Sequence, residues 1–136
     1  MIRFVALLLA TALAVVGVVG VATAGEVVVE AVYAAQYGVY PLFIALVFAH
    51  GDLPLADVQL LVNDTTAIVE DRVQKYVLDP SKNATLFLIK KYGTTVVHPG
   101  DTLTALVTAE AGGGGALAVP CGSLSPTPYY FVLCRP

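Results

Sequence analysis

Hydrophobic and polar positions follow two different patterns on either side of Gly25. Residues 4–22 form an apolar run without charge, interrupted by the single polar residue Thr11. From Val27 onward, short runs rich in Val, Tyr, Thr, Phe and Ile are separated by Gly, Pro, Asn and Asp. The pattern therefore predicts one hydrophobic helix over residues 1–24, followed by an all-β domain over residues 25–136.

The short runs predict about eight strands, spaced as in an Ig-like or jelly-roll-like β-sandwich. The predicted strands cover residues 27–35, 42–49, 56–62, 73–78, 85–91, 102–109, 116–120 and 129–134.

The run LFIALVFA at residues 42–49 is apolar at every position, so both faces of this strand are hydrophobic. A strand of this kind is either central and covered on each side, or exposed on one side until a neighbouring molecule covers it. It is too short to cross a membrane.

Composition extends this point to the whole chain, of which 57% is hydrophobic and 12% charged. Neither residues 31–51 nor residues 111–134 contain Asp, Glu, Lys or Arg, and such stretches favour burial in a core or against a partner. The net charge of -3, with seven Lys and Arg, argues against nucleic-acid binding.

Five of the basic residues lie between Arg72 and Lys91. This cluster indicates either an electrostatic docking face or a solvated surface, because Glu70, Asp71 and Asp79 are interspersed with it.

The apolar run at residues 4–22 has two interpretations. As a helix it spans about 28 Å, which suits a permanent membrane anchor. Alternatively it is a secretory signal, with Ala22-Thr23-Ala24 fitting the cleavage pattern before Gly25. Arg3 before the run and Glu26 after it favour an outward-facing domain. Both interpretations place residues 25–136 outside the cell or at its surface.

Cys121 and Cys134 are the two cysteines of the chain, and in an exported protein they predict a disulfide. Such a bond closes a short loop and stabilises the fold by roughly 3 kcal/mol on the chain-entropy model. Two free thiols and a zinc site are the alternatives, the latter without further ligands at suitable spacing.

Asn63-Asp64-Thr65 and Asn83-Ala84-Thr85 match the acceptor pattern for N-glycosylation. Both lie near the predicted ends of strands, so Asn63 and Asn83 are candidate glycan sites.

Motifs for catalysis are not evident. His50 and His98 lie in turn sequences, and a secreted enzyme is an alternative only if a pair such as His98 with Asp101 is catalytic. The four glycines at Gly112–Gly115 predict a hairpin turn rather than a phosphate loop. Asp64, Glu70 and Asp71 lack EF-hand spacing. We therefore expect no enzyme activity, no metal and no cofactor.

Two segments resemble archaellin-like and archaeal type IV pilin-like domains: HGDLPLADVQLLVND at residues 50–64 and VVHPGDTLTALV at residues 96–107. An apolar N-terminal helix followed by a β-sandwich is also similar to that superfamily, which includes the stator-type proteins that anchor the archaellum. The resemblance implies a non-enzymatic protein that forms or anchors an extracellular filament.

If the chain is cleaved after Ala24, the new N-terminus GEVVVEAVYAAQ resembles a donor strand. The residues expected to assemble in this way are Val27, Val28, Val29, Val32 and Tyr33. The alternative is an ordinary first strand of the chain's own domain. In either case Gln36, Tyr37 and Gly38 are expected to form a hinge.

Two function hypotheses follow. The first is a structural cell-surface protein whose partners are identical subunits or a surface-layer protein, with residues 4–22 in the membrane if they are retained. The second is a monomeric adhesion or binding module that recognises a surface glycan or surface-layer protein through His50–Leu53 or Gly112–Gly115.

Overall fold

The computed structural model describes residues 26–124 and 131–136, which form strands and no helix. The strands are β2 (Val27–Tyr37), β3 (Leu42–Gly51), β4 (Leu55–Val62), β5 (Thr66–Ala67), β6 (Arg72–Asp79), β7 (Ala84–Tyr92), β8 (Thr102–Ala109), β9 (Gly114–Ser123) and β10 (Phe131–Cys134). The all-β prediction is confirmed. Each predicted strand is present with small shifts at its ends, and the short β5 is additional.

The predicted helix over residues 1–24 lies outside the described residues. Among residues 26–124 and 131–136, no helix is long and apolar enough to cross a membrane.

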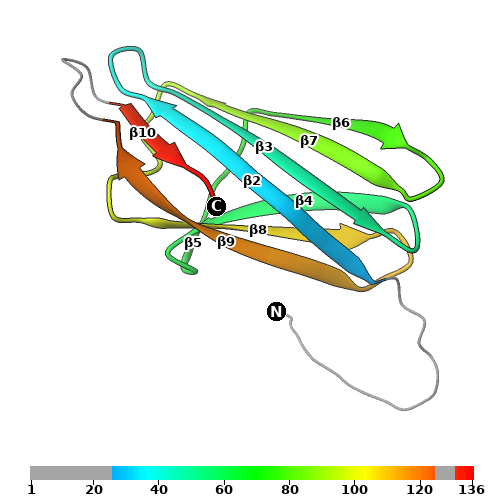
Figure 1. Ribbon diagram of the computed structural model, residues 1–136. Helices are drawn as coiled ribbons and strands as arrows, with labels where there is room; N and C mark the ends of the chain where they lie inside the picture. Colours follow the sequence, from blue (N-terminus) through cyan, green and yellow to red (C-terminus); the bar gives the residue numbers. More distant parts are fainter. Residues whose placement is uncertain (1–25, 125–130) are drawn as a thin grey trace.

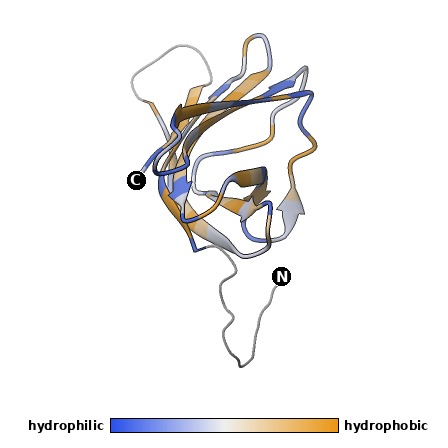
Figure 2. Cartoon of the chain, turned by 90° about the vertical axis from the view of Figure 1, so that its right-hand side faces the viewer, coloured by the Kyte–Doolittle hydropathy of each residue, from blue (hydrophilic) through white to orange (hydrophobic). Residues whose placement is uncertain are grey.

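The strands form one antiparallel sheet in the order β5-β4-β8-β9-β10-β2-β3-β7-β6. The sheet folds into two facing layers, β10-β2-β3-β7-β6 and β5-β4-β8-β9 (Figure 1). The fold occurs along β9, which pairs with β8 through Pro120 and with β10 from Cys121 onward. In Figure 2 the two layers are seen end on, with the core between them.

Strand alternation places the core between the layers. In β3, buried residues Phe43, Ala45, Val47 and Ala49 alternate with partly exposed ones. In β2 the register shifts between Val29 and Ala31, so this bulge lets Val29 and Val32 both point inward.

Gln36 is fully buried, yet its amide has partners. Its Oε1 accepts a hydrogen bond from Val96 N at 2.8 Å, and its Nε2 donates to Tyr37 O at 3.0 Å and to Thr94 O at 3.4 Å. Gln36 therefore ties the connection between β7 and β8 to the end of the first layer. Because β2 continues through Tyr37, the hinge expected at Gln36–Gly38 is wrong for its first two residues, and the turn occupies residues 38–41.

A disulfide joins Cys121 and Cys134, which are directly opposite each other on β9 and β10. The prediction from the cysteine pair is confirmed. Cys121 also forms two backbone hydrogen bonds with the turn before β8: its carbonyl accepts from Gly100 N and its N–H donates to Asp101 O. The disulfide thus fastens the seam at which the sheet passes between layers.

The glycine run Gly112–Gly115 has two roles. Gly112 and Gly113 have φ of 100° and 88°, which suits glycine and confirms the predicted turn. Gly115 instead lies in β9, where a Cβ would overlap the carbonyl oxygen of Val27. A side chain there would push β9 away from the start of β2.

Gly115→Ala should destabilise the fold by about 1–3 kcal/mol, because the added methyl group has no room beside β2. Thermal unfolding followed by circular dichroism measures this as a fall in Tm of roughly 5–20 °C. Gly122→Ala on the same strand is the matched control, since nothing lies within 4 Å of its Cβ position. Equal Tm values for the two variants would contradict the close approach of β9 and β2.

Gln36→Met should lower the Tm by roughly 10 °C or more, because Val96 N and Thr94 O lose their buried partner at a cost of about 1–3 kcal/mol each. The matched control is Gln59→Met on β4, where the glutamine is exposed. Thermal unfolding of both variants measures the difference, and an unchanged Tm for Gln36→Met would show that this glutamine does not hold the connection.

Candidate functional site

The side of β3 that faces away from the core carries four large apolar residues, Leu42, Ile44, Leu46 and Phe48. All four are only partly buried, in contrast to their neighbours on the inner side. The sequence predicts that this strand is either covered on both faces or exposed on one. In the described chain the inner face of β3 is buried and the outer face is partly exposed.

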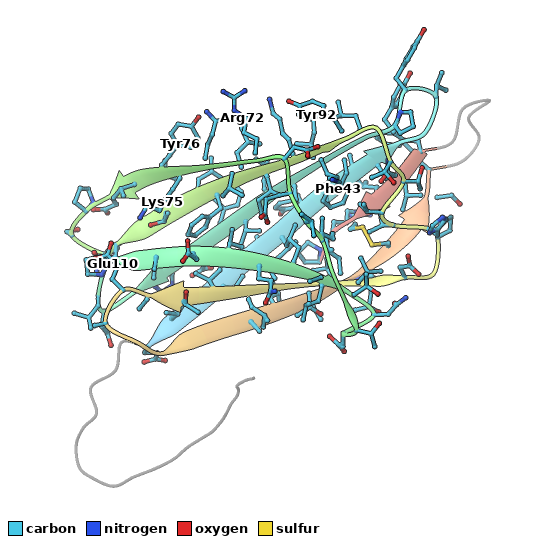
Figure 3. The ribbon with its side chains drawn as sticks, turned by 180° about the vertical axis from the view of Figure 1, so that it is seen from behind. Phe43, Arg72, Lys75, Tyr76, Tyr92 and Glu110 are labelled. Atoms are coloured by element: carbon cyan, nitrogen blue, oxygen red, sulfur yellow. A yellow bond between two sulfur atoms is a disulfide. The ribbon has the colours of Figure 1, made fainter. Side chains whose placement is uncertain are left out.

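Adjacent strands extend this surface across the whole first layer. In register with β3, the following residues share its outward side: Tyr33, Ala35 and Tyr37 of β2, Leu86, Leu88 and Tyr92 of β7, Tyr76 of β6, and Phe131 and Leu133 of β10. Together with the four β3 residues they make the outer apolar face. Tyr33, Tyr76 and Tyr92 are 45%, 43% and 50% exposed. Figure 3 shows Tyr76 and Tyr92 pointing away from the second layer, whereas Phe43 lies between the layers.

The second layer presents a different outer side. Residues in register there are small or polar apart from two leucines: Asp57, Gln59, Leu61, Thr104, Leu106, Thr108, Ala116, Ala118 and Pro120. The two layers therefore differ in what they offer to solvent. A contiguous apolar surface on one side is typical of a site where another molecule packs.

Charged residues lie at two opposite corners of the outer apolar face. Arg72 of β6 and Lys90 of β7 are directly opposite each other. Like charges in this position destabilise a strand pair, and no carboxylate among the described residues forms an ion pair with either. The other corner holds Glu30, whose Oε2 lies 2.7 Å from His50 Nε2.

Another polar contact lies beside the corner formed by Arg72 and Lys90. Asp71 Oδ2 accepts a hydrogen bond from Tyr92 N at 2.7 Å, and Lys91 Nζ lies 3.5 Å from Asp71 Oδ1. The Tyr92 hydrogen bond, with a smaller contribution from Lys91, lowers the pKa of Asp71 below its usual value. The predicted basic cluster is therefore not one surface. Lys91 pairs with Asp71, Arg72 and Lys90 lie on the outer apolar face, Lys75 contacts β4, and Lys82 lies in the turn between β6 and β7.

The edge of β6 is less suited to binding than the face. Lys75 points toward the second layer, where its Nζ donates to Leu55 O of β4 at 3.0 Å (Figure 3). A bulge follows between Val77 and Asp79, and Pro80 comes next. Inward charges, bulges and prolines are devices that prevent edge strands from pairing with other chains.

The residues predicted for assembly separate into two groups. Val27, Val29 and Val32 are buried in the chain's own core, whereas Val28 and Tyr33 are exposed. Their strand β2 pairs with β10 on one side and β3 on the other. The described chain thus contains β2 as a central strand of its own sheet.

Asn63 and Asn83, the predicted glycan sites, both adopt φ of 54°, a conformation that asparagine tolerates. Asn63 Nδ2 donates to Asp101 Oδ1 at 3.0 Å, and Asn83 Nδ2 donates to Gly51 O at 3.0 Å. Both asparagines therefore shape turns, and their glycosylation stays a prediction.

The His98–Asp101 pair also lies in a turn. Asp101 Oδ2 accepts a hydrogen bond from His98 N at 2.8 Å, while the ring Nδ1 of His98 is 3.8 Å away. The Asn63 amide and, next, the His98 backbone N–H lower the pKa of Asp101. This geometry is that of a turn cap joining residues 63 and 98–102. No cluster of three His, Cys, Asp or Glu suited to a metal occurs within residues 26–124 and 131–136.

No protein-family model matches the chain, and neither a curated protein nor a solved structure is significantly similar to it.

Asp101 generates a prediction about pH. Its folded pKa lies below the ordinary 3.8, so it contributes stability above about pH 4 and loses that contribution as the pH falls through the folded pKa. Asp101→Asn should therefore lose less free energy of unfolding than the wild type as the pH falls. Chemical unfolding at pH 7 and pH 3 measures the loss of free energy for each protein. Equal losses in the wild type and Asp101→Asn would contradict a role for this carboxylate.

Proposed function

We propose that this chain is a structural protein of the cell surface that assembles through its outer apolar face, as a subunit or an anchor of an extracellular filament. The observation that carries the proposal is the outer apolar face, which crosses all the strands of one layer and is open to solvent among the described residues. Binding there removes apolar area from water and needs neither a catalytic group nor a cofactor.

The strand order supports an Ig-like rather than a jelly-roll-like sandwich. One layer contains β2-β3-β7-β6 and the other β4-β8-β9. Lettered A to G in chain order, the strands are β2, β3, β4, β6, β7, β8 and β9. The two layers are then A-B-E-D and C-F-G, as in a constant-type immunoglobulin sandwich. Here β10 is added beside β2, and the disulfide joins the neighbouring strands β9 and β10 at the seam instead of strands B and F.

Export is supported by the disulfide and by the composition of the chain. Disulfides persist in oxidising environments outside the cytosol. The described chain begins at Glu26, directly before β2, so a retained helix over residues 4–22 would connect to the centre of the first layer. Membrane attachment and sheet packing would then act on the same layer.

The adhesion module is a second candidate, because the connections that contain its two predicted segments lie at the same end of the sandwich. Glu110 N donates to Pro54 O at 2.9 Å, and Asp52 N donates to Glu26 O at 3.2 Å. The connection between β3 and β4 and that between β8 and β9 therefore lie at one end of the sandwich, beside the start of β2 (Figure 1). A binding site formed by these loops would lie next to any N-terminal anchor.

Leu46→Glu should abolish assembly, because it places a carboxylate at the centre of a packed apolar surface. We expect an affinity loss of at least about 100-fold, or roughly 2.7 kcal/mol. Leu106→Glu is the matched control, a half-buried leucine on the outer side of the second layer. Sedimentation of the purified full chain and negative-stain microscopy of cell surfaces measure assembly.

Circular dichroism and the Tm of both variants establish that they fold. Equal assembly of Leu46→Glu and Leu106→Glu would refute the role of the outer apolar face. Loss of glycan or surface-layer binding upon changes at Asp52 or Gly113, with Leu46→Glu still binding, would instead favour the adhesion module.

A further inference from the structure

The partner of the outer apolar face has recognisable chemistry, because the two charged corners carry opposite signs. Arg72 and Lys90 form one corner, whereas Glu30 lies at the other. A uniformly acidic partner would suit the first corner and be repelled by the second. A surface that carries complementary groups at opposite corners is instead complementary to itself, which is what an isologous contact between identical chains requires.

The positions of these corners define a symmetry axis. Lys90 is in register with Ile44, one row from Leu46 along β3. Glu30 lies at the bulge next to Ala31, which is in register with Phe48 on the other side of Leu46. Across the sheet, Lys90 and Glu30 belong to β7 and β2, the two neighbours of β3. Leu46 therefore lies close to the midpoint of the line between the two corners.

We propose that the outer apolar face packs against the same face of a second copy, about a twofold axis that passes close to Leu46. The axis lies in the plane of the interface, perpendicular to the line between the two corners. Rotation about it therefore brings Arg72 and Lys90 of each copy opposite Glu30 of the other. The strands of the two copies then cross at a steep angle, as in orthogonal sheet packing. This inference rests on the proposed function and names its partner.

The size of the face suits such a dimer. The layer is five strands wide, which at about 4.8 Å between strands gives a width of roughly 24 Å. Along the strands, about seven residues at roughly 3.4 Å each give a similar length. Each copy thus contributes on the order of 500 Å², for a total of about 1,000 Å², the lower limit for a specific interface. Because an isologous contact closes on itself, filament growth from this dimer requires a separate contact.

A charge exchange tests the pairing of the corners. Glu30→Lys alone and the double variant Arg72→Glu/Lys90→Glu should each weaken dimerisation of the full chain about 10-fold or more. Mixing the two variants should restore it, because the lysine introduced into one chain then faces the two carboxylates introduced into the other. At the second corner, the native basic pair faces the native Glu30. Sedimentation equilibrium measures both the separate variants and the mixture.

Cysteine trapping tests the position of the axis. Leu46→Cys should form an intermolecular disulfide under mild oxidation, because residues on a twofold axis contact their own copies. Leu106→Cys, on the outer side of the second layer, is the control and should form no intermolecular disulfide. The Tm of each variant is measured first to establish the native fold.

Failure of the mixture to associate, or equal trapping at positions 46 and 106, would overturn the twofold dimer. If the wild type stays monomeric at about 1 mM while Leu46→Glu still loses assembly at the cell surface, a different partner covers the face. In that case the proposed function stands and only the second copy is rejected. If neither dimerisation nor surface assembly depends on Leu46, both proposals fail.

Discussion

The rest of this structure depends on a sheet layer that is hydrophobic on both sides and covered on one side along β2, β3 and β7. In β3, Phe43 and Val47 pack against the second layer, whereas Leu46 and Phe48 face outward. Covering the inner side stabilises the domain through ordinary burial of apolar area. The same burial remains available on the outer side, and this supports the proposed association.

Several contacts hold the second layer against the inner side of β2, β3 and β7. Gln36 holds the connection that passes from β7 to β8, and the Cys121–Cys134 disulfide fastens the seam between β9 and β10. Gly115 lets β9 approach the start of β2. At the edge formed by β6, the exposed Lys75 donates a hydrogen bond to the backbone of β4. In the proposed assembly, these contacts favour face-to-face packing over exchange of strands.

In the proposed dimer, the charges on the outer apolar face orient the two copies. Apolar packing is not directional, so it supplies affinity without orientation. Arg72 and Lys90 face each other despite their like charges, and Glu30 has its polar contact at the opposite corner. Electrostatic complementarity of this kind determines the register of an interface more than its strength.

The sequence by itself determined the strands, because alternation and turn residues act locally: Thr102–Ala109 was predicted at the bounds that the structure has, and the cysteine pair allowed one disulfide. It also showed that both faces of residues 42–49 are apolar. Gln36 was misassigned to a hinge, because its partners at residues 94–96 are distant in sequence. Only the tertiary structure decided which face stays open and which charges share it, since cross-strand register brings together residues such as Arg72, Lys90 and Ile44 that local patterns treat separately.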